Sequence, residues 1–315
     1  MRPYVRLAVV ALIACALAAG AFLARRGRER DRRDLDALVT VGGDLAHDAF
    51  HPALDLTRLN DHDETALGRE IDACVRGGLT VGTDGATQIY LDAVLRRVAA
   101  GAERPGIPYT VALVRSSQVN AWAVAGGRLY LTDGMLRFLR SEAELAAVLG
   151  HEISHVDLRH CVERLQMERA ARRIDPGLAA LARLGYEIML RGFSEEQELQ
   201  ADGNGALLAA RAVYDPWQAI EMYRRLPGGA GAVRRPTRDP VIEVAAAIPE
   251  ALQRYLETHP PVEERLEAVR RALAGHPADW RGARRYVGRS NLAARQTLEA
   301  APRDEEWITR DAAPP

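Results

Sequence analysis

A single pentapeptide, His-Glu-Ile-Ser-His at residues 151–155, constrains this chain more than any other feature. Ser141 followed by Glu144 predicts the start of a helix, and apolar residues recur beyond it at helical spacing. Two histidines four positions apart then project from one face of that helix, close enough to share a metal ion. Glu152 stands beside the first histidine, where it can take a proton from a water on that metal.

The surroundings of this motif favour a metal site. The simpler alternative is a surface helix with two exposed histidines and a solvated glutamate. However, the apolar run Ala-Ala-Val-Leu-Gly directly precedes the motif, which indicates a buried helix. A buried His-Glu-x-x-His needs a partner such as a metal. The pattern therefore predicts a zinc-dependent peptidase with one Zn²⁺ per chain.

Catalytic zinc usually has three protein ligands, so one more must come from elsewhere. A third histidine on the same helix is excluded, because Cys161 stands where it would be needed and His160 is one residue out of register. Residues 193–206 offer Glu198 and Asp202, four apart on one helical face. Alone, they indicate a solvated charged face. Beside an unfinished zinc site, Glu198 becomes the candidate third ligand and Asp202 a candidate acceptor for a ligand imidazole.

Residues 118–132 alternate in the manner of two strands around a Gly-Gly pair, which predicts a β-hairpin. Residues 109–114 are expected to form a neighbouring strand. An edge strand beside a metal cleft can pair with an extended peptide through its backbone. An ordinary core hairpin is the alternative. Within the segment 120–124, the candidate substrate-binding residues are Asn120, Ala121 and Trp122.

Four blocks resemble one known family in matching order along the chain: residues 119–136, 144–160, 198–202 and 258–265. The chain resembles the gluzincin metallopeptidases of HtpX and the CAAX prenyl proteases, and most closely their periplasmic, BepA-like branch. The resemblance covers about residues 63–270. It implies zinc bound by His151, His155 and Glu198, with Glu152 as the catalytic residue and Asp202 as a supporting acid.

The resemblance also places His259 near the metal, where it could occupy the water site and hold the enzyme latent. The residues alone indicate a helix stop before a Pro-Pro pair, and both interpretations stay open. His259 and Arg265 are candidates for an oxyanion contact. Two departures from the family are Ala125, where a proline is usual, and the lack of an evident tetratricopeptide array after Arg270.

We therefore expect an α+β, mainly α fold: a zincin-type catalytic domain with a small antiparallel β-sheet packed on the metal-binding helices. Periodicity predicts helices at 63–77, 84–101, 141–170, 177–191, 194–212, 215–226, 241–257 and 261–275. The Gly/Pro/Arg-rich segment 227–240 is a candidate lid over the cleft. The expected domains are an N-terminal anchor or signal segment at 1–33, a metallopeptidase domain at 34–275 and an extension at 276–315 that ends in a disordered tail from residue 300.

The N-terminal segment contains an apolar run from Leu7 to Ala24, which is barely long enough to span a bilayer. An uncleaved anchor, lipidation at Cys15 and cleavage near Ala18 are all compatible with it. The arginines at 25–33 favour a cytoplasmic catalytic domain by the positive-inside rule. The family resemblance favours the periplasm, so we expect an envelope protein with a periplasmic catalytic domain.

The net charge of −1 gives no support for nucleic-acid binding. Cys74 and Cys161 have no spacing that predicts a disulfide, so two buried thiols are expected. The expected function is a membrane-associated zinc endopeptidase that acts on unfolded or misassembled envelope proteins. The alternative is a latent or non-cleaving, chaperone-like adaptor. CAAX-type processing would need several apolar spans, and the sequence has one. The sequence leaves the oligomeric state and the natural substrate undetermined.

Overall fold

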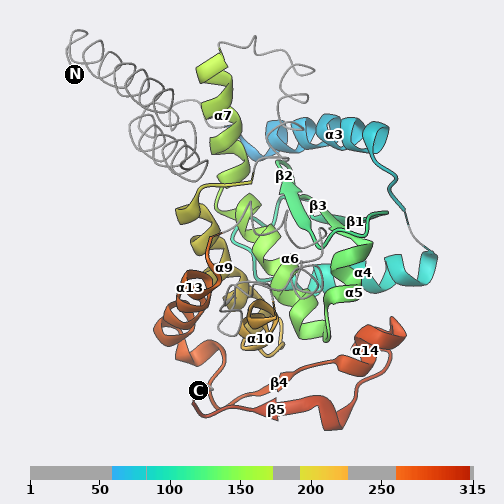
Figure 1. Ribbon diagram of the computed structural model, residues 1–315, viewed down its shortest axis with the longest axis vertical. Helices are drawn as coiled ribbons and strands as arrows, with labels where there is room; N and C mark the ends of the chain where they lie inside the picture. Colours follow the sequence, from blue (N-terminus) through green and yellow to red (C-terminus); the bar gives the residue numbers. More distant parts are fainter. Residues whose placement is uncertain (1–58, 83, 173–191, 226–259, 313–315) are drawn as a thin grey trace, which may run out of the picture. The chain divides into compact units, whose positions relative to one another are not determined.

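Two helices at the centre of the fold, α6 (Glu142–Asp157) and α9 (Glu195–Arg211), pack against each other along their length (Figure 1). The computed structural model describes residues 59–82, 84–172, 192–225 and 260–312. These residues belong to one compact unit, which spans residues 53–315.

Further helices and strands of the described residues surround the central pair. The other helices are α3 (Asp61–Gly78), α4 (Gly85–Ala99), α5 (Asp133–Phe138), α7 (His160–Arg172), α10 (Gln218–Arg224), α13 (Val262–Gly275) and α14 (Arg289–Ala294), with short 3-10 turns η2 (Pro277–Asp279) and η3 (Asp304–Glu306). The strands are β1 (Thr110–Val114), β2 (Ala121–Val124), β3 (Arg128–Thr132), β4 (Arg284–Tyr286) and β5 (Trp307–Thr309). Helices predominate in the described part of the chain, as expected for an α+β, mainly α fold.

The helix α6 begins where the sequence predicts. The Ser141 hydroxyl accepts a hydrogen bond from the backbone N–H of Glu144 at 3.1 Å, which satisfies one free donor of the first turn. The Glu144 carboxylate does not return to Ser141: it accepts from the N–H of Arg140 at 2.8 Å and pairs with Arg225 at 2.6 Å. Every residue of α6 is buried, so its histidine motif lies inside the protein.

Two glycines allow α6 and α9 to touch. A Cβ added to Gly205 would lie 2.5 Å from the backbone nitrogen of His151, and one added to Gly150 would lie 2.6 Å from the carbonyl oxygen of Gly205. No side chain fits between the two backbones at this point. The close approach brings the metal-ligand face of α6 directly against the helix that carries Glu198.

The predicted hairpin is present, but the sheet is mixed instead of antiparallel. β2 and β3 pair antiparallel around Gly126 and Gly127, whose φ angles of 77° and 78° are left-handed. β1 pairs parallel with the other edge of β3, which gives the strand order β1-β3-β2. The tight turn makes β2 the neighbour of β3 on one side. The chain from β1 therefore crosses the end of β3, where Asn120 accepts a backbone hydrogen bond from Thr132 at 3.0 Å.

The single helix predicted for 141–170 is divided into α6 and α7. The helix is interrupted at Arg159, which has a left-handed φ of 65°. The break has a long-range cause, because the Asp157 carboxylate accepts two hydrogen bonds of 2.8 Å from the backbone N–H groups of Glu103 and Arg104. The Arg159 guanidinium in turn donates to Asp61 at 3.0 Å. These contacts form only when the α3–α4 region packs against the end of α6, so local periodicity could not predict them.

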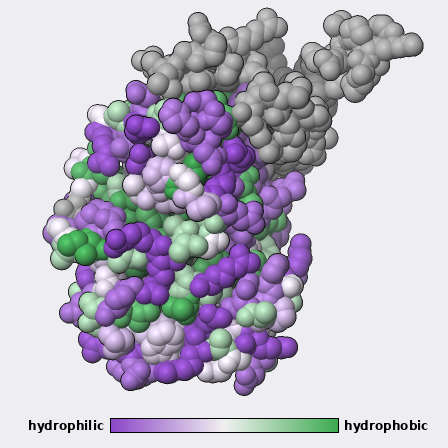
Figure 2. All heavy atoms as spheres, turned by 180° about the vertical axis from the view of Figure 1, so that it is seen from behind, coloured by the Kyte–Doolittle hydropathy of each residue, from purple (hydrophilic) through white to green (hydrophobic). Residues whose placement is uncertain are grey.

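The predicted helices at 63–77, 84–101, 194–212, 215–226 and 261–275 correspond to α3, α4, α9, α10 and α13. The helices predicted at 177–191 and 241–257, the candidate lid at 227–240 and the N-terminal segment 1–33 lie outside the described residues. Within the described residues, no helix is both long enough and apolar enough to cross a membrane. Figure 2 shows a face covered mostly by hydrophilic residues, with small hydrophobic patches between them.

The C-terminal part of the chain differs from the disordered tail expected from residue 300. β4 and β5 form a two-stranded sheet, and the buried Glu306 carboxylate accepts from the N–H of Ser290 at 2.7 Å at the start of α14. Backbone hydrogen bonds of 3.0 Å from Glu142 to Gly288 and from Ala143 to Val287 attach this region to the first turn of α6. A polar composition concealed this order, because the segment is fixed by contacts with α6 and not by an apolar core of its own.

Candidate metal centre

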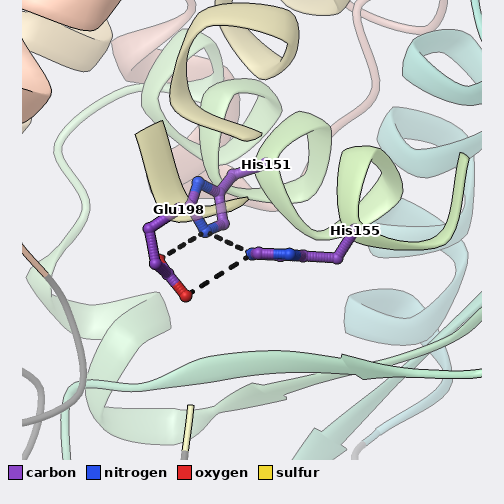
Figure 3. Close-up of side chains that lie close together, drawn as sticks. All are labelled: His151, His155 and Glu198. Carbon is purple, nitrogen blue, oxygen red and sulfur yellow. Dashed lines mark hydrogen bonds and ion pairs between the residues drawn. The ribbon is translucent and has the colours of Figure 1, made fainter. Parts of the chain in front are cut away.

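Three side chains from the two central helices converge on one point (Figure 3). His151 and His155 project from α6, and Glu198 projects from α9. The two Nε2 atoms lie 3.1 Å apart, and carboxylate oxygens of Glu198 lie 3.4 Å from the Nε2 of His151 and 3.7 Å from that of His155. All three residues are buried. The structure thus brings together the three metal ligands that the sequence predicts.

The geometry and the chemistry of these three groups fit zinc. Tetrahedral zinc with bonds of roughly 2.0–2.1 Å holds neighbouring ligand atoms about 3.3–3.4 Å apart, and two imidazole nitrogens with a carboxylate oxygen form a typical catalytic donor set. Electrostatics point the same way. Burial lowers the pKa of His151, but the carboxylates of Asp202 and Glu198 outweigh it and raise that pKa to about 10. The pocket therefore favours a positive charge at this position.

Asp202 lies beside His151, where the sequence analysis expected an acceptor for a ligand imidazole. Its Oδ1 lies 2.8 Å from the Nδ1 of His151 and accepts a hydrogen bond of 2.7 Å from the Tyr223 hydroxyl. Burial raises the pKa of Asp202, but the charge and hydrogen bonds of Arg265 outweigh it and hold the pKa at about 2. Asp202 is therefore a carboxylate that accepts the Nδ1 proton of His151, which leaves the Nε2 lone pair directed at the Glu198 side.

Arg265 lies behind Asp202. Its Nε and Nη2 donate to the two Asp202 oxygens at 2.7 and 2.6 Å, and its guanidinium lies 4.2 Å from the centre of the Tyr223 ring. Both Arg265 and Asp202 are almost completely buried. These contacts favour a role for Arg265 in positioning Asp202, rather than the oxyanion contact that the sequence analysis considered. His259, the other oxyanion candidate, lies outside the described residues.

The second ligand histidine is held by different neighbours. The Nδ1 of His155 lies 3.1 Å from the Nδ1 of His160, the first residue of α7. The Phe193 ring stacks on the His155 imidazole, with centroids 3.8 Å apart and planes 13° from parallel. The imidazole is therefore fixed by a hydrogen bond at one nitrogen and by an aromatic face.

Glu152 follows His151 on α6 and is buried, with 4% of its surface exposed. Burial raises its pKa to about 7, while the positive charge of His151 acts to lower it. A carboxylate with a pKa near neutrality can both accept and release a proton under physiological conditions. This is the property required of a general base that later acts as an acid.

The candidate substrate-binding residues lie on β2 and immediately before it, and β2 packs against α6. Asn120 and Trp122 are half-buried, and the Trp122 ring stacks on Tyr130 with centroids 5.3 Å apart. β2 is the edge of its sheet, and no other strand among the described residues pairs with its outer side. At one position, the buried Cys161 thiol approaches the carbonyl oxygen of Ala123 at 3.8 Å.

Cys161 and the exposed Cys74 are both free thiols, so only one of the two is buried as expected.

The sequence did not indicate Tyr223, His160 or Phe193 as parts of the site. Tyr223 comes from α10, and nothing in its local pattern marks it as a neighbour of Asp202. The sequence showed His160 only as a histidine out of register with the motif, within a helix predicted to continue to residue 170. The break at Arg159 places its ring beside His155.

This arrangement defines a buried candidate metal centre of two histidines and one carboxylate with an adjacent glutamate, on an α+β scaffold. Residues 86–273 match the family described as "Peptidase family M48". That match covers more than half of the chain, so the chain belongs to peptidase family M48, a family of zinc-dependent metalloproteases. The expected gluzincin family is thereby confirmed, and a metalloprotease is confirmed at the level of the family.

Several curated proteins are similar over part of the chain. The Mitochondrial metalloendopeptidase OMA1 of Schizosaccharomyces pombe is 29% identical over 153 residues, which are 46% of this chain and 45% of that protein. The Beta-barrel assembly-enhancing protease of Escherichia coli is 25% identical over 195 residues, 56% of this chain and 39% of that protein. A putative protease of the same name from Vibrio cholerae is 40% identical over 93 residues, 30% of this chain and 19% of that protein. The chain matches less than half of the length of each of these relatives.

Proposed function

We propose that this chain is a zinc-dependent endopeptidase with one Zn²⁺ held by His151, His155 and Glu198. The observation that carries the proposal is the buried convergence of these three ligand atoms, all within 4.8 Å of one another, beside Glu152. Membership of a metalloprotease family supports the same function.

The chemistry follows from the positions of the chain's own side chains. A bound zinc ion would polarise the attacking water and the scissile carbonyl group. The Glu152 carboxylate accepts a proton from that water and then donates it to the amine that leaves. Asp202 holds the Nδ1 proton of His151, so the ligand nitrogen stays available throughout. Burial of these groups excludes bulk water and strengthens their electrostatic interactions.

We further propose that the substrates are extended polypeptides, such as unfolded or misassembled envelope proteins. Among the described residues no strand pairs with the outer side of β2, and such an edge can hold an extended chain by backbone hydrogen bonds. A folded protein does not readily offer an extended chain. Two similar proteins are named for β-barrel assembly and for the mitochondrion, which supports an envelope or membrane setting. The apolar run at Leu7–Ala24 supports membrane attachment, with a periplasmic catalytic domain as our proposed orientation.

The test measures zinc content and casein cleavage in the purified full chain. Glu152→Gln keeps the shape of the side chain and removes the base, so we expect stoichiometric zinc with cleavage reduced by roughly 100-fold or more. His259→Ala tests the latency suggested by the family resemblance, and an increase in cleavage would support it. Glu70→Gln, an exposed glutamate on α3, is the matched control and should cleave as the wild type does.

Two results would contradict the proposal. Absence of zinc from the wild type would remove the metal centre. Bound zinc without cleavage, in the wild type and in His259→Ala alike, would favour the chaperone-like adaptor instead.

A further inference from the structure

The two ligand histidines are held by different chemistry. A carboxylate, Asp202, faces the Nδ1 of His151, whereas a second imidazole, that of His160, faces the Nδ1 of His155. Beyond the 3.1 Å contact between the Nδ1 atoms of His155 and His160, the Nε2 of His160 lies 3.2 Å from Oε1 of Gln200. The amide nitrogen of Gln200 donates in turn to Glu196 at 3.1 Å. These contacts connect α6, α7 and the exposed side of α9.

The hydrogen bonds between these four side chains determine which ring nitrogens carry protons. The Gln200 amide nitrogen donates to the Glu196 carboxylate, so its Oε1 faces His160 and can only accept. The Nε2 of His160 must therefore carry a proton, and in a neutral imidazole its Nδ1 is then an acceptor. The Nδ1 of His155 must donate to that acceptor, which leaves the Nε2 of His155 as a lone pair facing Glu198.

We propose that His160, oriented by Gln200, is a positioning residue that fixes the tautomer and the ring angle of the metal ligand His155. The proposal deepens the function proposed above and rests on it, because it requires a metal at His155. The break between α6 and α7 contributes to this arrangement. The left-handed turn at Arg159, held by a hydrogen bond of 2.8 Å to the carbonyl of Leu59, directs the first side chain of α7 back to the ligand helix.

The experiment is a competition titration of the full chain with a zinc chelator. His160→Phe keeps an aromatic ring of similar size and removes the acceptor, so we expect zinc affinity to fall about 10–100-fold, the usual effect of losing an outer-shell partner. His160→Asn places an amide oxygen near the former Nδ1 and should recover most of that loss. Gln200→Leu should weaken zinc binding less than His160→Phe, and Gln200→Glu, which keeps an acceptor, should bind better than Gln200→Leu.

The control is Gln88→Leu on α4, which also removes a glutamine whose amide donates to an acid one helical turn away. It should leave zinc affinity unchanged. Thermal unfolding of the metal-free variants separates a loss of metal affinity from a loss of folding. A zinc affinity of His160→Phe within about threefold of the wild type would overturn the proposed role of His160. Equal losses of zinc affinity in His160→Phe and His160→Asn would overturn it too. A wild type that binds no zinc would overturn the metal centre as well, so the two failures are distinguishable.

A spectroscopic measurement checks the protons directly. Two-bond ¹H–¹⁵N correlation spectra of the zinc-loaded chain, with labelled histidines, should show His155 protonated at Nδ1 and His160 protonated at Nε2. His160→Asn assigns the His160 signals, and the signals that shift on zinc loading identify the ligand histidines. A spectrum in which His160 carries its proton at Nδ1 would reverse the direction of the chain and refute the proposal.

Discussion

At the scale of single residues, Asp202 makes the most consequential contacts of the site. It faces His151 and accepts from Tyr223 and from two nitrogens of Arg265. Asp202→Asn removes the carboxylate that accepts from two nitrogens of the buried Arg265. We expect stability to fall by about 3–5 kcal/mol, because a buried cation loses the carboxylate that balances its charge. Zinc affinity should fall about 10–100-fold, as measured by chelator competition beside urea unfolding.

The double variant Asp202→Asn/Arg265→Met separates the two effects. Removal of the guanidinium that has lost this carboxylate should restore part of the stability, whereas zinc affinity should stay low because His151 still lacks the carboxylate of Asp202. Recovery of zinc affinity together with stability would show that Asp202 acts on folding alone.

The residues of the site differ in how far sequence alone could predict them. His151 and His155 share one helical face by spacing, and Glu198 and Asp202 share another, so each pair could be proposed from local pattern. Tyr223 could not, because its position beside Asp202 depends on how α10 packs against the site. The distinction is physical: sequence spacing determines which residues share a face of one helix, and packing determines which faces meet.

At the scale of elements, the contact between α6 and α9 is the feature that assembles the metal centre. Gly205→Ala would place a methyl group 2.5 Å from the backbone nitrogen of His151, where no flexible side chain can move away. The helices must separate, so we expect a loss of about 1–3 kcal/mol in stability together with weaker zinc binding. Gly77→Ala on α3 is the control, because its Cβ would meet nothing within 4 Å. Unfolding and zinc titrations of both variants check the prediction, and wild-type behaviour of Gly205→Ala would refute it.

The sequence predicted the existence of most described elements better than their connections. Helical periodicity found α3, α4, α9 and α13 because each buries an apolar face. It missed the break at Arg159, which depends on Asp157 binding backbone N–H groups more than fifty positions away. It also missed the parallel pairing of β1, because alternation marks a strand without giving the direction of its neighbour.

At the scale of the whole molecule, Glu142 joins parts of the chain that are distant in sequence. Its carboxylate accepts from Tyr214 at 2.8 Å, and its backbone N–H donates to Gly288 in the C-terminal region. Burial raises its pKa from 4.5 to about 7, although the hydrogen bond from Tyr214 acts to lower it. The C-terminal extension therefore docks onto the backbone of a residue whose carboxyl group takes up a proton more readily in the folded protein than in the unfolded chain.

This preference makes stability depend on pH with a defined sign. Because the folded pKa of Glu142 is above the unfolded value, its contribution is complete below pH 4.5 and is lost as pH rises through about 7. Glu142→Gln remains neutral, so the wild type should lose roughly 1–3 kcal/mol relative to this variant between pH 5 and pH 8. Urea unfolding of both proteins across that range, with zinc chelated, measures the difference. Other titrating groups are common to both proteins and cancel. A difference that does not change with pH would show that Glu142 is ionised in the folded state at pH 5 already.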